Sequence, residues 1–263
     1  MDLKYSRHLQ FIKPLAKQLY YRSRQLFLGQ GVVNANKQGL INFVDVGSVG
    51  WLPEPWFTHA KKISYLLKFE PRDGAESANF VTSIDTALWS KNEVCDFYVY
   101  KGLAGQGSSL FQQNVEYVKD NFETLKHRGL PELANTWIDR AELSHVEQIK
   151  CRRLDDVLEE NPDLPPFHLL KIDAQGAEHE ILQGAENLLA DSCIGLHLEL
   201  FTIPLYKGIT LLPDVAEYLK KFDFELVKKM PAHGSFESQH DCIFLKRGIK
   251  NQMAEEIRRV YEI

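Results

Sequence analysis

The segment from Phe167 to Leu189 constrains the fold of this chain more than any other. Residues 168–172 are a short, mostly apolar run typical of a buried parallel strand, and the run ends at Asp173. Gly176 makes a turn, and an amphipathic helix is predicted next because apolar residues recur at helical spacing. The apolar positions are Ala177, Ile181, Ala185, Leu188 and Leu189, and the other face carries Glu178, Glu180, Gln183 and Glu186.

A strand followed at once by a helix is the repeating unit of an open parallel α/β sheet. Ligands of such sheets bind in the crevice outside the carboxyl ends of the strands. Asp173, Gln175 and the first turn of the helix are therefore expected at a ligand site. The alternative, that Asp173 only caps the helix, is equally compatible with the sequence.

Residues 41–46 predict a second buried strand, and a turn with two glycines follows it. Gly47 and Gly50 would let the backbone pass close to a ligand. Their spacing differs from the GxGxxG that holds a pyrophosphate, so a dinucleotide is disfavoured. Asp45 also disfavours a dinucleotide, because its carboxylate would repel a pyrophosphate and would attract a cationic ligand.

Two more apolar runs, residues 63–69 and 79–84, predict the next strands of the sheet. Glu70 ends the first run, about twenty residues beyond the glycine turn, where an acid accepts hydrogen bonds from a ribose diol in βαβ arrangements. The alternative is a solvated glutamate. Residues 85–88 follow the second run and could frame a purine ring.

The second half of the chain predicts the rest of the sheet. Residues 193–200 are a strand with Glu199 near its carboxyl end, residues 211–222 a helix, and residues 225–228 and 242–245 a closing hairpin. Residues 253–261 predict a last helix. An extra strand is expected at residues 95–100, and the insertion at 112–150 would shape a pocket or an oligomer contact. Asp155 is interpreted as a helix cap.

Composition narrows the class of protein. With 263 residues, 44% of them hydrophobic, the chain can form one α/β domain with insertions. A net charge of -5 gives no overall attraction for nucleic acid. No apolar run approaches the roughly 18 residues of a membrane span, and the four separated cysteines favour reduced thiols in a cytoplasmic protein. Residues 1–28 are basic and amphipathic, which indicates a helical lid or a peripheral contact with an anionic membrane.

Together these segments resemble a class I S-adenosylmethionine-dependent methyltransferase, and more narrowly the FkbM family. The resemblance rests on FVDVGSVG at 43–50, FEP at 69–71, ALWS at 87–90, SSL at 108–110, RLDDVL at 153–158 and LLKIDAQGAEHEILQGAENLL at 169–189. It implies a Rossmann-like sheet of seven mostly parallel strands with an antiparallel last strand and helices on both faces. The expected organisation is an N-terminal helical segment (1–40), the methyltransferase domain (41–248) and a C-terminal helix (249–263).

The resemblance also implies roles for individual residues. Asp45, Gly47, Ser48 and Gly50 would line the methionine part of S-adenosylmethionine, and Glu70 would hold its ribose hydroxyls. Asp85, Thr86 and Ala87 would lie near the adenine.

The implied reaction is methylation of a hydroxyl on a small molecule or glycan, such as a sugar, a polyketide or a lipid-linked saccharide. Asp173 and Glu199, at the ends of adjacent strands, would act as a base or as an orienting pair. They could also hold a Mg²⁺ ion. His179 is a further candidate base, whereas His197, in the middle of a strand, is interpreted as a satisfied buried histidine.

Two other functions stay open at this point. The first is a catalytically silent cofactor-binding or scaffold protein, because Val49 stands where the family commonly has Asn and is followed by WLPEPW. The second is a Rossmann-type oxidoreductase, which the glycine spacing and Asp45 disfavour. A homo-oligomer is compatible with the sequence.

Overall fold

The computed structural model describes residues 39–47, 52–72, 77–78, 80–102 and 107–263 of the chain. Within these residues, eight strands form the main sheet in the order β10-β11-β9-β8-β1-β2-β4-β3. The strands that form it are β1 (Ile41–Val46), β2 (Ile63–Phe69), β3 (Ser77–Ala78), β4 (Val81–Ile84), β8 (Leu169–Ile172), β9 (Gly195–Phe201), β10 (Phe224–Lys229) and β11 (Gln239–Lys246).

Most of this sheet is parallel. β11 runs antiparallel to both its neighbours, β9 and β10, and the short β3 is antiparallel to β4. Every residue of β1 and β9 is buried, as expected for central strands covered on both faces. The predicted α/β fold, with seven mostly parallel strands and an antiparallel last strand, is confirmed; β3 is an addition to it.

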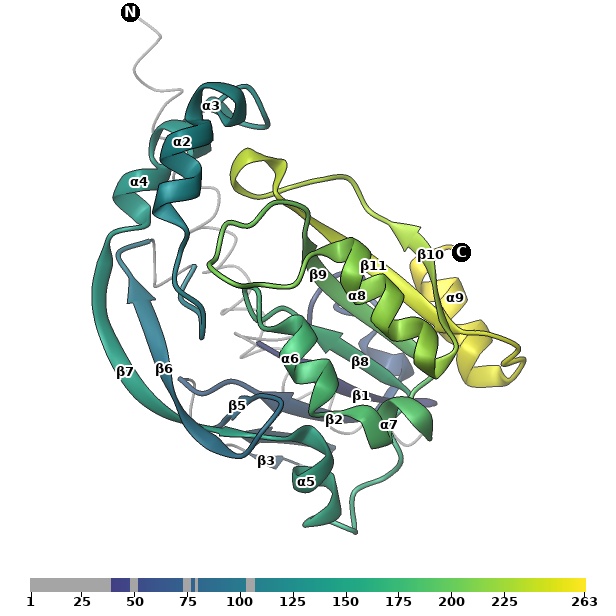
Figure 1. Cartoon of the computed structure of the whole chain (residues 1–263). Coiled ribbons are helices and arrows are strands. Elements are labelled where there is room, and N and C mark those ends of the chain that lie inside the picture. Colours follow the sequence, from purple (N-terminus) through teal and green to yellow (C-terminus); the bar gives the residue numbers. More distant parts are fainter. Residues whose placement is uncertain (1–38, 48–51, 73–76, 79, 103–106) are drawn as a thin grey trace, which may run out of the picture.

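Helices cover both faces of the sheet (Figure 1). One face packs against α5 (Leu154–Glu159), α6 (Glu178–Gln183), α7 (Glu186–Ala190) and α8 (Leu212–Leu219), and α9 (Gln252–Tyr261) packs on the other. Alternation along each strand sets the two cores: Val44 and Leu170 point to the first face, and Phe43 and Leu169 point to the second. Three short 3₁₀ helices, Ala60–Lys62, Lys220–Phe222 and Ser235–Glu237, complete the connections described here.

A second, smaller sheet has the order β5-β7-β6. It consists of β5 (Ala87–Leu88), β6 (Glu93–Tyr100) and β7 (Leu143–Arg152), and the connection from β6 to β7 carries α2 (Val115–Leu125), α3 (Pro131–Asn135) and α4 (Trp137–Arg140). β6 and β7 form a long curved ribbon that leaves the main sheet, with these three helices at its end (Figure 1). The strand expected at 95–100 is present, and β7 was not predicted.

Two predicted helices differ from the structure. The helix expected at 177–189 is broken into α6 and α7, because Gly184 lies so close to Trp89 that a Cβ would stand 2.1 Å from the Trp89 carbonyl oxygen. Residues 55–62, where the proline at position 55 suits the first turn of a short helix, instead form a series of turns ending in a 3₁₀ turn. There the Thr58 hydroxyl donates to the Pro55 carbonyl oxygen at 3.0 Å, a local bond that competes with helix formation.

The segment 1–28, predicted to be basic and helical, lies outside the described residues. The predicted C-terminal helix is α9, and its Ile257 and Tyr261 are buried against the sheet.

Candidate active site at the carboxyl edge of the sheet

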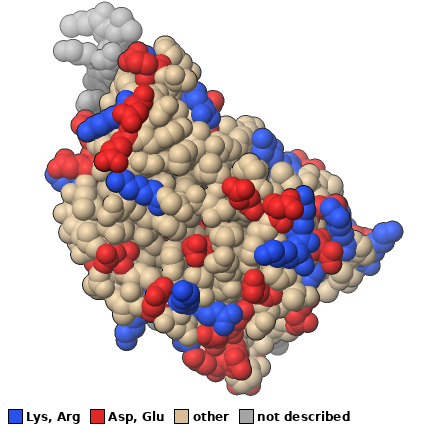
Figure 2. Space-filling model, viewed as in Figure 1, with Lys and Arg blue, Asp and Glu red and all other residues tan. Residues whose placement is uncertain are grey.

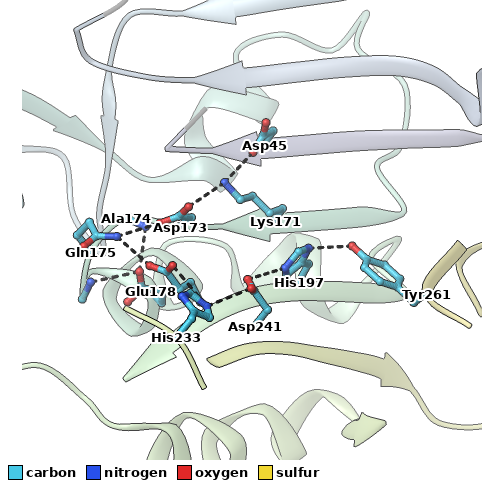
Figure 3. A network of polar contacts seen from close by, with 12 residues as sticks. Asp45, Lys171, Asp173, Ala174, Gln175, Glu178, His197, His233, Asp241 and Tyr261 are labelled. Carbon is cyan, nitrogen blue, oxygen red and sulfur yellow. Dashed lines mark hydrogen bonds and ion pairs between the residues drawn. The ribbon is translucent and has the colours of Figure 1, made fainter. Parts of the chain in front are cut away.

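One face of the central strands carries a row of polar side chains. Asp45 of β1 is aligned with Lys171 of β8, and Lys171 is aligned with His197 of β9. Because side chains two residues apart point to the same face, Asp173 and Glu199 lie on this face as well, nearer the carboxyl edge. Figure 3 shows Asp45, Lys171, Asp173 and His197 of this row within a network of polar contacts.

Lys171 is a buried cation between two carboxylates. Its Nζ lies 3.3 Å from Asp45 Oδ1 and 3.5 Å from Asp173 Oδ2, and the residue is only 6% exposed. Burial works to lower the pKa of Lys171, but Asp45 and Asp173 outweigh it and raise the pKa above the ordinary value. Lys171 therefore stays charged and holds both acids in place.

Asp45 accordingly lies beneath the edge of the sheet, with an exposed fraction of 1%. The sequence predicted that it lines the methionine part of a cofactor, whereas its nearest charged group here is Lys171. That cofactor contact stays a prediction. The interaction with Lys171 was missed because the lysine stands within an otherwise apolar run.

Asp173 and Glu199 are brought together by the amide of Gln175. The Gln175 Nε2 donates to Asp173 Oδ1 at 3.2 Å and to Glu199 Oε2 at 2.8 Å. The Tyr206 hydroxyl lies 3.1 Å from Gln175 Oε1, and Ser109 Oγ donates to the Gln175 carbonyl oxygen at 2.8 Å. Gln175 has a positive φ of 53°, and these contacts hold it in that conformation.

The surroundings of the two carboxyl groups shift their pKa values in opposite directions. Burial opposes ionisation of Asp173, but Lys171, Glu199 and Gln175 together lower its pKa. Burial and the neighbouring Asp173 raise the pKa of Glu199 well above the ordinary value. The Asp173 side chain is 37% exposed. The more accessible group, Asp173, is therefore the one whose ionised form is favoured, and the buried Glu199 is the one whose neutral form is favoured.

Glu178 was predicted on the polar face of a helix, and the structure corrects this. It is 3% exposed and turns back toward the loop, where its Oε1 accepts the backbone N–H groups of Ala174 at 2.9 Å and Gly176 at 3.2 Å. Burial raises the pKa of Glu178 to about 7. Glu178 lies only two residues after Gly176 in the sequence, and this short spacing is the signal that could have identified it as a hydrogen-bond acceptor for the loop.

The first glycine turn passes directly against the end of β8. Gly47 has a φ of +72°, and a Cβ there would stand 1.9 Å from the Asp173 carbonyl oxygen. Gly47 N–H donates to the Phe69 carbonyl oxygen at 3.0 Å, which brings the neighbouring Glu70 to the same edge. Ser48 and Gly50, predicted with Gly47 as cofactor contacts, lie outside the described residues.

The remaining predicted cofactor residues follow β2 and β4. Because Phe69 is aligned with Ile84, Glu70 and the exposed Asp85 leave the sheet side by side. Thr86 instead contacts β7, with its hydroxyl 3.2 Å from the Lys150 carbonyl oxygen, and Ala87 pairs with β7 as part of β5.

A group that sequence reasoning missed lies at the start of β11. Asp241 Oδ1 lies 2.9 Å from His197 Nε2, and Asp241 Oδ2 lies 3.1 Å from His233 Nε2. His197 is 3% exposed and its Nδ1 is 3.0 Å from the Tyr261 hydroxyl, so it is the satisfied buried histidine that was expected. His233 and Asp241 went unrecognised because they reach Glu199 only through the antiparallel pairing of β11 with β9, which sets Asp241 opposite Glu199, and through the bridge between His233 and Gln239.

His179 is not brought to Asp173 and Glu199. Its ring packs edge-on against Tyr218 of α8 with centroids 4.9 Å apart, in the helical layer on the other face of the sheet. Its catalytic role stays a prediction that these contacts do not support. Among the residues described, no group of three or more His, Cys, Asp and Glu side chains is arranged to hold a metal ion, so the Mg²⁺ site is not supported.

The helical insertion α2–α4 packs beside this edge. Trp137 of α4 contacts Phe236, with ring centroids 5.9 Å apart, and Arg140 Nη2 donates to Ser235 Oγ at 2.9 Å. Phe236 and Ser235 belong to the loop between β10 and β11, which also carries His233. The insertion therefore supports a loop that borders the candidate site.

Charges are mixed on the face of the molecule seen in Figure 2. Basic and acidic side chains alternate there, and the described residues on that face form no continuous basic stripe. None of the helices described is long and apolar enough to cross a membrane.

Comparison with known proteins identifies the family. Residues 11–226 match the model of the methyltransferase FkbM domain. No curated protein matches the chain. The crystal structure of methyltransferase FkbM from Methylobacillus flagellatus KT is similar over 78% of this chain, with 13% identity and a TM-score of 0.42. This chain spans 43% of that protein's length. Because the matched domain covers most of the sequence, the chain belongs to the FkbM methyltransferase family.

Proposed function

We propose that this methyltransferase transfers a methyl group from S-adenosylmethionine to a hydroxyl of a small molecule or glycan. The observation that carries the proposal is the meeting of Asp173 and Glu199 at the Gln175 amide. This pair comes from the ends of neighbouring parallel strands, where ligands of α/β sheets bind.

The residues at the edge fit such a cofactor. It supplies a methyl group already activated by a positively charged sulfur. Glu70 and Asp85 are adjacent carboxylates at the ends of β2 and β4, suited to hydroxyl and amine donors. We assign Glu70 to the ribose hydroxyls, Asp85 to the neighbourhood of the adenine, and the turn that begins at Gly47 to the methionine part.

Asp173 and Glu199 would orient the acceptor. The ionised Asp173 can accept a hydrogen bond from a hydroxyl, and the protonated Glu199 can donate one. Neither is a strong base near neutral pH, because Asp173 has a lowered pKa and Glu199 already carries its proton. Their role is to align the hydroxyl for attack, which is a large part of catalysis for a methyl group that needs no further activation.

Calorimetric titration with S-adenosylmethionine and S-adenosylhomocysteine tests the cofactor assignment. We expect micromolar affinity, on the order of 8 kcal/mol, and a loss of roughly tenfold in Glu70→Gln, because hydrogen bonds to a charged group contribute about 1.5–3 kcal/mol. Glu93→Gln, on exposed β6, is the matched control and should bind as the wild type does. Absence of binding to the wild-type protein would refute the cofactor.

Transfer of a labelled methyl group to hydroxyl compounds tests the reaction. Asp173→Asn should retain the cofactor and lose most of the transfer. Cofactor binding without transfer to any hydroxyl would favour the alternative of a silent cofactor-binding protein. A cytoplasmic location is part of the proposal and is supported by the four cysteines, all of which are free thiols.

A further inference from the structure

The proposed reaction leaves one proton without an acceptor, since Asp173 and Glu199 only orient the hydroxyl. His233 lies beside them, on the loop between β10 and β11. Its side chain is 39% exposed, and its Nε2 is 3.9 Å from Glu199 Oε1. The imidazole of His233 therefore lies next to the place where Asp173 and Glu199 are proposed to orient the acceptor hydroxyl.

The hydrogen bonds around Asp241 determine where the protons lie. The Asp241 carboxylate can only accept at His197 Nε2, so in the neutral ring Nδ1 accepts from the Tyr261 hydroxyl at 3.0 Å, and that hydroxyl accepts from Trp56 Nε1–H at 2.8 Å. His197 then carries its proton on Nε2 and donates it to Asp241 Oδ1 at 2.9 Å. This buried chain fixes one oxygen of Asp241 and aims the other at His233 (Figure 3).

His233 is oriented by that second oxygen. Its Nε2 is buried and lies 3.1 Å from Asp241 Oδ2, an ion-pair contact in which the N–H is not aligned for a hydrogen bond, so the exposed surface of the ring belongs to its other atoms. A carboxylate at one imidazole nitrogen keeps the proton there and leaves the other nitrogen free of a proton. Nδ1 is then the nitrogen available to a ligand.

We propose that His233 is the catalytic base, which accepts the proton of the substrate hydroxyl at Nδ1, with Asp241 and His197 as positioning residues. This inference rests on the proposed function. It adds the proton acceptor that the carboxyl pair lacks.

The step balances without another reactant. The O–H bond of the acceptor breaks and its proton moves to His233 Nδ1, while an electron pair of the oxygen forms the new O–CH₃ bond and the S–CH₃ bond breaks. The sulfur keeps the electrons of the broken bond and becomes neutral. The imidazolium, stabilised by Asp241, returns the proton to water when the product leaves.

The charges that face His233 come from three strands. Asp241 of β11 raises the pKa of His233, burial opposes this in part, and Asp173 of β8 adds to the rise. Glu199 of β9 faces it as well, with a raised pKa that favours its neutral form. The pKa of His233 is therefore above the ordinary 6.5. The rate of methyl transfer should rise as the pH increases through the pKa of His233, because only the neutral imidazole can accept a proton.

Nitrogen-15 NMR of the histidine rings tests the geometry in the wild-type protein without an acceptor. We expect neutral His233 to carry its proton on Nε2, and Asp241→Asn to lower the pKa of His233 toward 6.5. A neutral ring protonated on Nδ1 would overturn the proposal, as would a His233 pKa unchanged in a folded Asp241→Asn variant.

Kinetics test the chemical role, with glycerol, methyl glucoside and catechol as the hydroxyl probes and labelled S-adenosylmethionine as the methyl donor. His233→Gln should slow transfer by roughly 10²–10⁴-fold, abolish the rise with pH, and leave the affinity for S-adenosylmethionine unchanged. His145→Gln, on the exposed part of β7, is the control and should match the wild type. Transfer within threefold of wild type in His233→Gln would overturn the inference.

The two proposals fail differently. A wild-type protein that does not bind S-adenosylmethionine, or that methylates none of the probes, counts against the proposed function. The ring measurements still decide whether His233 is built to accept a proton. Conversely, full transfer by His233→Gln removes the inference and leaves the methyltransferase assignment intact.

Discussion

Lys171 determines the electrostatics of the candidate site at the scale of a single residue. Its ammonium group keeps Asp173 ionised and holds Asp45 below the edge of the sheet. Removing one partner of a buried ion pair leaves the other charge uncompensated. This lowers the free energy of unfolding by more than the intact pair contributes to it. The roles of both acids therefore depend on one lysine, which lies on the strand next to Asp45 and two residues before Asp173.

Gly47 yields a prediction at the same scale. Gly47→Ala should lower the free energy of unfolding by roughly 3 kcal/mol or more, because a strained φ and a contact with rigid backbone are combined. Gly208→Ala is the matched control: its φ is +80°, but a Cβ would meet nothing within 4 Å. It should cost only about 1 kcal/mol. Urea denaturation measures the free energy of unfolding of both variants. An equal decrease in the two variants would disprove the role of close packing against Asp173.

Residues at strand ends were the predictable part of the site. Asp173, Glu199 and Glu70 each end an apolar run, and parallel strands bring their carboxyl ends to one edge. Asp241 and His233 could not be placed in this way. Asp241 lies within the antiparallel strand β11 and His233 lies in the loop before it, and their proximity to Glu199 depends on a register that no local pattern specifies.

At the scale of elements, the break between α6 and α7 is stabilised from outside. Asp155 was predicted to cap the helix in which it lies, and the structure corrects this. Its carboxylate accepts the backbone N–H groups of Asn187 at 3.0 Å and Leu188 at 3.1 Å, in the first turn of α7. The sequence shows a capping residue here but does not show which helix it caps.

Replacing Asp155 should therefore destabilise the protein through a different helix. We expect Asp155→Ala to cost about 1–3 kcal/mol, since two buried N–H groups lose their acceptor. Asp156→Ala removes only partly exposed contacts with Asn92 and Arg153 and should cost less than about 1 kcal/mol. Thermal or urea unfolding measures both. A loss in Asp156→Ala as large as that in Asp155→Ala would contradict the assignment.

The β6–β7 ribbon illustrates why some elements escape sequence analysis. β7 is exposed along most of its length, so it lacks the alternation of apolar and polar residues that identifies a half-buried strand. Val146 and Leu143 are apolar yet 44% and 45% exposed. Its pairing with β6 comes from tertiary structure, and the three helices between the two strands hide the hairpin in the sequence.

For the whole molecule, Glu178 predicts how stability depends on pH. Its pKa is about 7 when folded, against an ordinary value of 4.5, so between these values the folded protein binds more protons than the unfolded chain. The free energy of unfolding should then fall as the pH rises from about 4.5 to about 7. Glu178→Gln should reduce this fall by on the order of 2 kcal/mol, because glutamine keeps an acceptor and cannot ionise.

Urea titrations at pH 5 and pH 7.5 provide the measurement. Glu199 remains in both proteins, and loss of the Glu178 charge removes one cause of its raised pKa, so the difference between the profiles reports Glu178 together with its effect on Glu199. Parallel pH profiles for the wild type and Glu178→Gln would disprove the predicted titration.

The position of β11 has a consequence for biosynthesis. This strand is later in the chain than β10 but lies between β9 and β10 in the sheet. As the nascent chain leaves the ribosome, β10 emerges before the strand with which it pairs. The edge of β9 stays unpaired until β11 follows. The Tyr261 hydroxyl that satisfies His197 emerges later still. The sheet can therefore close only once β11 has emerged, and the hydrogen-bonded chain behind Asp241 only once α9 has followed.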